Sequence, residues 1–305
     1  MSAQLETPVL FLLFNRPDTT QKVFEAIKKQ QPAKLYIAAD GPRTEKIGEN
    51  KICNETRDIV TKNIDWKCEV KTLFRDKNLG CKIAVSSAIN WFFENEEEGI
   101  ILEDDCLPDQ SFFMFCETLL KYYREDERVM HIGGNNFLDG KIIGEASYYF
   151  SNIHHIWGWA TWRRAWKKYD VNTPLYEKFI KGGYLKSLFP ELHYQLLWQS
   201  IFDKIKNGKL NTWDYQWTLS IWINNGLGII PNKNLVTNLG FSDNATHTNS
   251  SSNDSLANRK SNTVHEIIHP EIIQRNYEAE KYTLDTYLIK GFTNKLKLKI
   301  KGLIK

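Results

Sequence analysis

Long apolar runs and a dominant charge are both missing from this sequence of 305 residues. The longest strongly apolar stretch, Val9 to Phe14, is far shorter than the roughly 20 residues that span a bilayer. The first residues, MSAQLETP, lack the basic region of a signal peptide. We therefore expect a cytoplasmic protein.

Cysteine is also scarce. The five cysteines contain no C-x-x-C pair, which argues against a zinc knuckle and against a disulfide framework. We expect buried, reduced thiols.

The phosphate-binding loops of the large nucleotide-binding classes are absent as well. The chain has no G-x-x-x-x-G-K-[ST] loop and no G-x-G-x-x-G after its first predicted strand. If a nucleotide binds, its diphosphate must be neutralised by a metal ion and by side chains such as Arg16 or Lys82.

No charge of one sign prevails, because 40 basic residues stand against 37 acidic ones. A net charge of +3 gives no reason to expect a nucleic-acid partner. The exception is the C-terminal end, where TYLIKGFTNKLKLKIKGLIK has lysines, no acid and interspersed Leu and Ile. This pattern is typical of a segment lying on an anionic membrane surface, and also of a solvated tail.

Aromatic residues, in contrast, are abundant: 16 Phe, 13 Tyr and 10 Trp. They are typical either of sugar- or base-binding clefts or of dense core packing. The spacing of Trp159, Trp162 and Trp166 predicts one core-facing helix surface. For Trp157 or Trp159 we expect a role in lining an acceptor cleft.

Short apolar runs alternate with amphipathic stretches in the first half, which predicts an α/β fold with a mixed, mostly parallel sheet flanked by helices. The predicted strands are Val9–Phe14, Leu35–Ala39, Val70–Phe74, Ile100–Leu102 and Val129–Ile132. The predicted helices between them are Thr19–Lys29, Lys51–Asn63, Lys82–Glu94 and Ser111–Tyr123. Further on we expect helices over Tyr184–Lys206 and Trp213–Asn224, a strand over Leu227–Ile230 and a polar loop over Ser242–Thr263.

Ligands of such sheets bind beyond the carboxyl ends of the parallel strands. Charged residues follow four predicted strands, in the segments Asn15–Asp18, Asp40–Arg43, Arg75–Asn78 and Glu103–Asp105. Asp18 is explained as an ordinary acid at a helix start.

The acidic triplet Glu103–Asp105 is the most informative of these segments. Three adjacent carboxylates at the end of a buried strand repel one another unless a cation compensates them. Hard oxygen ligands suit Mg²⁺ or Mn²⁺. The alternative is a solvated acidic turn.

Several of these segments together resemble a known family. The order PVLFLLFNRPD, KLYIAADGPR, FRDKNLGC, GIILEDDCLPDQSFF and WGWATWRR, between about Thr7 and His247, resembles bacterial nucleotide-sugar glycosyltransferases of the GT-A fold. It is also distantly similar to N-acetylglucosaminyltransferase I. The resemblance implies a Rossmann-like GT-A fold with a nucleotide-sugar half (1–125), an acceptor half (126–250) and a polar loop, helix and basic tail (251–305).

The resemblance also implies roles for individual residues. Arg16 and Asp40 would hold the nucleotide, with Asp40 facing the uracil edge, and Asp104 would lie near the ribose or the sugar. Asp105 would contact the Mn²⁺ or Mg²⁺ ion. His247 would approach the metal or the diphosphate.

An inverting transfer also needs a general base on the acceptor side. In the family this acid belongs to a W-D-D-W stretch, which matches Trp213-Asp214-Tyr215 here and makes Asp214 the candidate. Because only one acid stands where the family has two, a neighbouring residue could hold the role. Alternatively, Asp214 only caps the helix that follows.

The sequence thus predicts a metal-dependent, inverting glycosyltransferase that uses a UDP-sugar, with UDP-GlcNAc among the candidate donors. The acceptor would be a hydroxyl group of a bacterial surface glycan or of its lipid-linked precursor. One alternative is a nucleotidyltransferase acting on sugar phosphates, although the Gly-rich loop typical of that class is missing. The other is a carbohydrate-binding protein without catalysis, which would leave the acids at the strand ends without a role.

Overall fold

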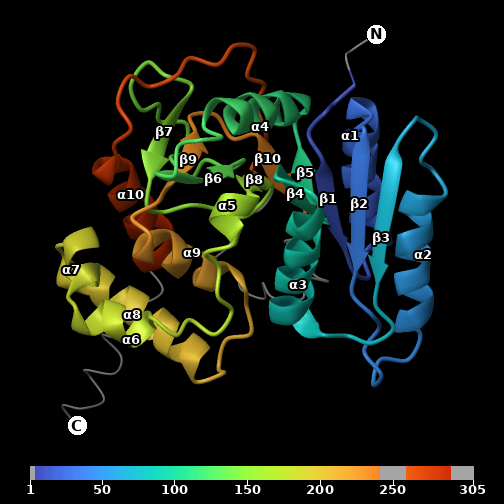
Figure 1. Cartoon of the computed structure of the whole chain (residues 1–305), viewed down its shortest axis with the longest axis horizontal. Helices are drawn as coiled ribbons and strands as arrows, with labels where there is room; N and C mark the ends of the chain where they lie inside the picture. The colour runs from blue at the N-terminus through green and yellow to red at the C-terminus, as the bar shows by residue number, and fades with distance from the viewer. Residues whose placement is uncertain (1–3, 241–258, 290–305) are drawn as a thin grey trace.

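The computed structural model describes residues 4–240 and 259–289 (Figure 1). The strands are β1 Val9–Leu13, β2 Lys34–Ala39, β3 Glu69–Phe74, β4 Glu98–Glu103, β5 Cys106–Pro108, β6 Val129–Gly133, β7 Tyr148–Ser151, β8 Trp159–Trp162, β9 Leu227–Pro231 and β10 Val236–Asn238. The helices are α1 Pro17–Gln30, α2 Glu49–Thr61, α3 Gly80–Asn95, α4 Gln110–Tyr122, α5 Arg163–Trp166, α6 Tyr176–Lys181, α7 Tyr184–Leu188, α8 Leu192–Lys206, α9 Asp214–Ile223 and α10 Tyr277–Thr283, followed by a π-helical turn η1 Leu284–Ile289.

Eight strands form one sheet in the order β3-β2-β1-β4-β8-β6-β9-β7. Strands β1 to β4 pair in parallel, as the alternation of strands and helices predicts. Strand β8 runs antiparallel to both of its neighbours, β4 and β6. Strands β5 and β10 form a separate two-stranded antiparallel sheet. The predicted mixed, mostly parallel sheet flanked by helices is confirmed.

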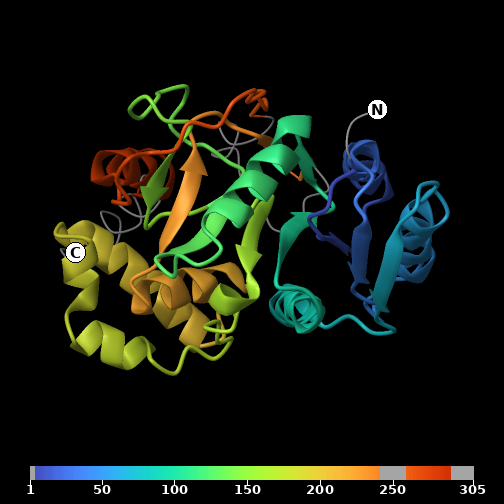
Figure 2. The same cartoon turned by 45° about the horizontal axis from the view of Figure 1, so that its top comes forward.

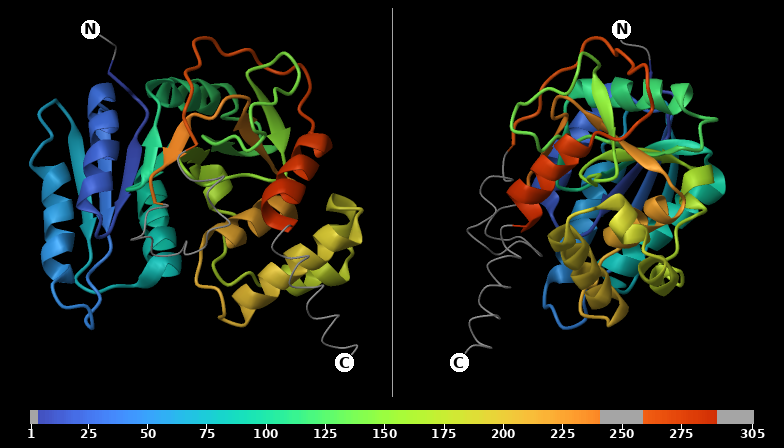
Figure 3. Two further views of the ribbon diagram at one scale, coloured as in Figure 1. Left: turned by 180° about the vertical axis from the view of Figure 1, so that it is seen from behind. Right: turned by 90° about the vertical axis from the view of Figure 1, so that its left-hand side faces the viewer.

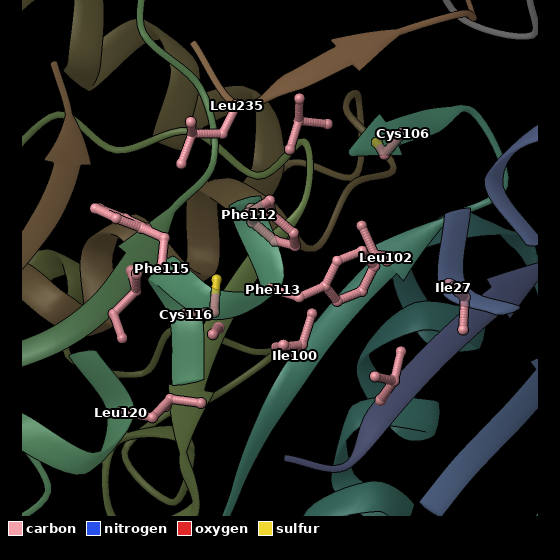
Figure 4. Packing of buried hydrophobic residues seen from close by; sticks show 14 of the residues in the cluster. Ile27, Ile100, Leu102, Cys106, Phe112, Phe113, Phe115, Cys116, Leu120 and Leu235 are labelled. Atoms are coloured by element: carbon pink, nitrogen blue, oxygen red, sulfur yellow. The ribbon is translucent and has the colours of Figure 1, made fainter. Parts of the chain in front are cut away.

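The two faces of the sheet carry different cores, because successive side chains of a strand point to opposite faces. In β1, Val9, Phe11 and Leu13 pack with side chains of α1 and α4, whereas Leu10 and Leu12 pack with those of α3. Figure 4 shows part of the first core, where Phe112 and Phe113 of α4 lie over Ile100 and Leu102 of β4. Strands β1, β2 and β4 are thereby buried on both faces, which fixes the positions of their ends, whereas the edge strand β3 is largely exposed.

Helices α6, α7 and α8 form a separate group beside the sheet, which we call the helical lobe (residues 175–210) (Figure 2). The single helix predicted over Tyr184–Lys206 is wrong, since α7 ends before Phe189 and α8 begins after Glu191. Pro190 lies in this break, and a proline disfavours helical backbone at the residue before it. In Figure 3, α10 and η1 lie beside the lobe, and Tyr194 of α8 donates a hydrogen bond to Asp285 of η1 (2.7 Å).

The tryptophan segment differs from the prediction. Trp159 to Trp162 form strand β8, not a helix, so these two residues point to opposite faces of the sheet. Trp162 and Trp166 are buried as expected, but Trp159 is also fully buried and cannot line a cleft. Trp157 is half-buried, and its role in lining an acceptor cleft stays a prediction.

The five cysteines are free thiols, as expected, but only Cys53, Cys106 and Cys116 are buried, whereas Cys68 and Cys81 are half-buried. Within residues 4–240 and 259–289, no helix has the length and apolar character needed to cross a membrane. The described part of the polar loop begins at Arg259, and most of the lysine-rich tail falls outside the described residues.

Candidate functional site

A cavity of about 260 Å³ opens at the carboxyl ends of β1, β2 and β4, beside the first turns of α3. Its floor is built from small and apolar side chains of these strands and of α3. Its charged lining residues are Arg16, Asp40, Arg43, Arg75, Glu103 and Asp104. Four loops that the sequence marked separately thus meet in one place.

Two members of the acidic triplet, Glu103 and Asp104, line this cavity, whereas Asp105 is not among its lining residues. Asp104 is nearly buried and accepts hydrogen bonds from the backbone amide of Phe14 (3.0 Å) and from Arg16 (3.4 Å). Arg16 also forms an ion pair with Asp105. The arginine that follows β1 is therefore the cation that compensates the acids that follow β4.

The electrostatics of this cluster are strongly perturbed. Burial, together with the charges of Asp105 and Asp104, raises the pKa of Glu103. Burial and the charge of Asp105 likewise raise the pKa of Asp104. Burial disfavours the charge of Arg16, yet the neighbouring carboxylates outweigh it and raise its pKa. The cluster carries more negative charge than one guanidinium compensates.

The chain after β10 closes around Asp105. The backbone amide of Leu239 donates to the carbonyl oxygen of Asp105 (2.7 Å), which extends the pairing of β10 with β5. Gly240 then lies so near the carboxylate that a Cβ at this position would be 2.3 Å from Oδ2 of Asp105. The thiol of Cys106 donates to the other carboxylate oxygen (3.4 Å).

Asp40 orders the loop between β3 and α3. Its carboxylate accepts hydrogen bonds from the side chain of Asn78 (2.9 Å) and from the amides of Leu79 (3.0 Å) and Gly80 (3.1 Å). The next residue must be glycine, because a Cβ on Gly41 would lie 2.4 Å from the backbone of this loop. Asp40 borders the cavity, but its oxygens hold protein groups in this structure.

Arg43 is also committed to a protein partner. It forms an ion pair with the buried Glu49 at the start of α2, which in turn accepts a hydrogen bond from Asn15 (2.9 Å). The Arg43 hydrogen bond, which outweighs burial, lowers the pKa of Glu49. This clamp joins the loop after β2 to the loop after β1.

Arg75 differs from the other two arginines of the cavity. Its guanidinium donates to the hydroxyl group of Ser87 (2.7 Å), and no ion pair joins it to an acid in the described part of the chain. It is thus the arginine of this cavity lining that has charge to offer an anionic ligand.

Asp214 is the first residue of α9 and accepts a hydrogen bond from Thr212. The preceding residue, Trp213, is the N-cap, so Asp214 is a first-turn acid rather than the cap. Burial raises the pKa of Asp214.

Cys81 shows where Asp214 lies relative to the other acids. Burial, followed by the charges of Glu103 and Asp214, raises the pKa of the Cys81 thiol to about 12. Cys81 lines the cavity, so Asp214 lies near the cavity as well. Asn211, three residues before Asp214, is itself a lining residue.

The remaining predicted residues are less well supported. Lys82 belongs to the first turn of α3 and is half-buried, but it is not among the residues that line the cavity. His247 lies outside the described residues.

The carboxylates present here fit a divalent metal ion that is bound together with a substrate. In the part of the chain that the structure describes, no group of three His, Cys, Asp or Glu side chains is placed to hold a metal alone. Mg²⁺ and Mn²⁺ commonly use one or two carboxylates and complete their shell with water and substrate phosphates. Asp105, and Asp104 beside it, could supply those carboxylates.

The chain also contains a sequence pattern that is typical of zinc sites but does not have the conformation of one. The sequence His265-Glu266-Ile267-Ile268-His269 matches H-E-x-x-H, which binds zinc when a helix places both histidines on one face. These residues are not helical here. His269 instead stacks on Tyr122, with ring centres 3.9 Å apart, and its Nδ1 shares a hydrogen bond with Tyr148 (2.7 Å).

Sequence reasoning overlooked several parts of the site. It marked the segment of Arg75 as charged but gave that residue no role, and it had no local signal for Gly240 or for the Arg43–Glu49 clamp. Gly240 approaches a residue 135 positions earlier in the chain, and the Arg43–Glu49 pair depends on how the loop between β2 and α2 is folded.

The fold and the site together define an α/β protein with an acidic, arginine-bearing cavity at the carboxyl edge of its sheet. No known family profile matches the chain, and no curated protein sequence matches it.

Solved structures give distant similarities. The mannosyltransferase PcManGT from Pyrobaculum calidifontis, in complex with GDP-Man and Mn²⁺, is 11% identical with a TM-score of 0.40; the match covers 56% of this chain and 49% of that one. TarS 1-349 from S. aureus is 10% identical with a TM-score of 0.41, over 76% of this chain and 59% of that one. A UDP-glucose pyrophosphorylase complexed with UDP-glucose is 13% identical with a TM-score of 0.32, over 53% and 78% of the two chains.

This chain therefore spans about half the length of the mannosyltransferase that it matches.

Proposed function

We propose that the chain is a metal-dependent, inverting glycosyltransferase that transfers a sugar from a UDP-sugar to a hydroxyl group of a bacterial surface glycan or its lipid-linked precursor. The observation that carries this proposal is the cluster of Glu103, Asp104 and Asp105 around Arg16, of which Glu103, Asp104 and Arg16 line the cavity. Strand ends of α/β sheets are where nucleotide ligands bind. An acidic cluster there gives a metal and a diphosphate a common binding place.

Each residue of the site then has a task. Arg75 binds the donor, because its charge is not committed to a carboxylate of the described residues. Asp40 and Glu49 act indirectly, since they order the loops on either side of the donor. A Mn²⁺ or Mg²⁺ ion held by Asp105 would offset the charge of the departing diphosphate.

Asp214 acts as the general base. It accepts the proton of the acceptor hydroxyl group while that oxygen forms a bond to the anomeric carbon of the donor. The bond between this carbon and the diphosphate oxygen breaks, and UDP leaves with the electron pair. The raised pKa of Asp214 favours proton uptake.

The test is a thermal-shift titration with UDP, GDP, CMP and dTDP, each with and without Mn²⁺. A ligand that binds only the folded state raises the melting temperature. We expect stabilisation by UDP that requires Mn²⁺, is lost in Asp105→Ala and is retained in Asp76→Ala, which removes an exposed acid of a neighbouring loop. No shift with any nucleotide, or a shift that survives Asp105→Ala, would contradict the proposal.

Product analysis separates the enzyme classes. A glycosyltransferase slowly releases UDP from a UDP-sugar such as UDP-GlcNAc, whereas a nucleotidyltransferase needs added pyrophosphate and forms UTP. A carbohydrate-binding protein forms neither product.

A further inference from the structure

The helical lobe carries an apolar groove far from the proposed donor site. The groove has a volume of about 330 Å³ and lies between α6, α7 and the end of α9. Its lining includes Leu175, Lys178, Phe179, Tyr184 and Trp222. Figure 1 shows α6 and α7 at the opposite end of the molecule from α1 and α2.

Large apolar side chains at this groove are exposed to solvent. Leu175 is 45% exposed and Tyr184 is 58% exposed, and both line the groove. Two more leucines of the lobe, Leu192 (65%) and Leu196 (40%), lie four residues apart on α8. Clusters of exposed apolar side chains of this kind mark interaction surfaces.

The lobe also carries lysines without an acidic partner. Lys178 lines the groove, Lys186 is exposed on α7, and neither has an ion-pair partner among the described residues. From residue 175 to residue 210 the lobe has six lysines, no arginine and three acids. Apolar side chains among unpaired lysines match the surface of an anionic bilayer.

The sequence of the C-terminal segment is basic as well. Residues 290–305 contain six lysines and no acid. The preceding Ile289 belongs to the same buried cluster as Leu185 and Phe189 of the lobe. The lobe has a net charge of +3, and residues 290–305 have a net charge of +6. Because the whole chain has a net charge of +3, the remaining residues have a net charge of −6. An anionic surface would orient such a molecule with the lobe toward it.

We propose that the groove of the helical lobe docks on an anionic phospholipid bilayer. Leu175 and Tyr184 would insert into the interface, and Lys178 and Lys186 would lie at the level of the lipid headgroups. The proposal does not depend on the reaction at the donor site.

The experiment is sedimentation of the full chain with vesicles of phosphatidylcholine alone or with one quarter phosphatidylglycerol. We expect binding to the anionic vesicles only. Since each lysine near such a surface contributes about 1 kcal/mol, Lys178→Gln with Lys186→Gln should weaken binding about 30-fold. The matched control, Lys22→Gln with Lys29→Gln, removes two exposed lysines of α1 and should bind like the wild type.

A second pair of variants tests the apolar part. Leu175→Ser with Tyr184→Ser should also weaken vesicle binding of the full chain. The same two substitutions should weaken the binding of a chain that lacks residues 290–305, compared with that shorter chain alone. Each variant is first checked for the melting temperature of the wild type in the absence of ligand, so that a misfolded variant is not mistaken for a failed membrane site. Vesicle binding that depends on residues 290–305 but not on the groove would overturn the proposal. So would concentration-dependent dimers that the groove variants abolish, because the groove would then hold a second copy.

Discussion

The carboxylate of Asp105 lies directly against the Cα of Gly240, which belongs to the segment following β10. A Cβ on residue 240 would be 2.3 Å from Oδ2 of Asp105 and 3.0 Å from the side-chain oxygen of Asn238. The proposed metal ligand is thus positioned by backbone that lies 135 residues further along the chain.

Gly240→Ala should therefore displace the Asp105 carboxylate. We expect Mn²⁺ affinity, measured by calorimetry in the presence of UDP, to fall about 10- to 100-fold, as for other groups that orient metal ligands. The control is Gly133→Ala, because a Cβ at residue 133 meets its nearest neighbour at an ordinary 3.4 Å. Equal Mn²⁺ affinity of the Gly240 variant and the wild type would remove Asp105 from the metal site.

Asp214→Asn should separate binding from chemistry. UDP affinity should stay the same, because the substitution leaves the cavity lining intact, while turnover should fall about 10²- to 10⁴-fold with the loss of a general base. In the wild type, the raised pKa of Asp214 should shift the acid limb of the kcat profile upward from that of an exposed aspartate. Unchanged turnover would assign the proton transfer to another residue.

Arg75→Ala should weaken UDP binding, since it removes a cavity arginine that no ion pair engages in the described structure. Hydrogen bonds to charged groups contribute about 1.5 to 3 kcal/mol, which corresponds to about 10- to 100-fold in the dissociation constant from calorimetry. Arg128→Ala removes an arginine that is paired with Asp126 outside the cavity and serves as the control. If both variants bind UDP equally well, Arg75 has no role in the donor site.

His131 predicts how stability depends on pH. It is fully buried in β6, and its Nδ1 accepts a hydrogen bond from Trp217 (3.3 Å), whose ring nitrogen can only donate. The ring is therefore neutral, with its proton on Nε2 facing the carbonyl oxygen of His155 (2.9 Å). Burial, reinforced by His154, holds the pKa of His131 well below its usual value.

The unfolded chain protonates this histidine below about pH 6.5, whereas the folded chain does not. The unfolded state then binds more protons, so the free energy of unfolding should fall as the pH falls below that value and should not depend on His131 above it. The contribution approaches about 1.4 kcal/mol per pH unit. Urea unfolding between pH 5 and 8 should show a smaller slope for His131→Gln than for the wild type or for His193→Gln, which removes an exposed histidine; equal slopes would contradict the assignment.

The sequence predicted those parts of the fold that depend on local pattern. Strand β1, and β2 after its first residue Lys34, consist of apolar residues and are followed by amphipathic helices, so their type and order follow from the hydrophobic pattern. Strand β8 could not be found this way. Trp159, Trp162 and Trp166 have helical spacing, but pairing with the distant strands β4 and β6 makes the first two part of a strand.

The same distinction applies to the site. Arg16, Asp40 and Asp104 border the cavity because each follows a strand, and the position of strand ends is predictable. The partners of these residues were not predictable. That Asp40 would bind the amides of Leu79 and Gly80 depends on how two loops meet, which no local pattern encodes.

Strand β8 also limits how this molecule can be re-engineered. Ala160 pairs with Ile100 of β4 on one side and with Ile132 of β6 on the other, so one residue links the strands of both predicted halves. A chimera joined near residue 125 keeps the β6–β8 pairing within one parent but would need to reproduce the β4–β8 register, or it would leave two open sheet edges. Properties of related proteins are therefore better exchanged by grafting loops than by recombining halves.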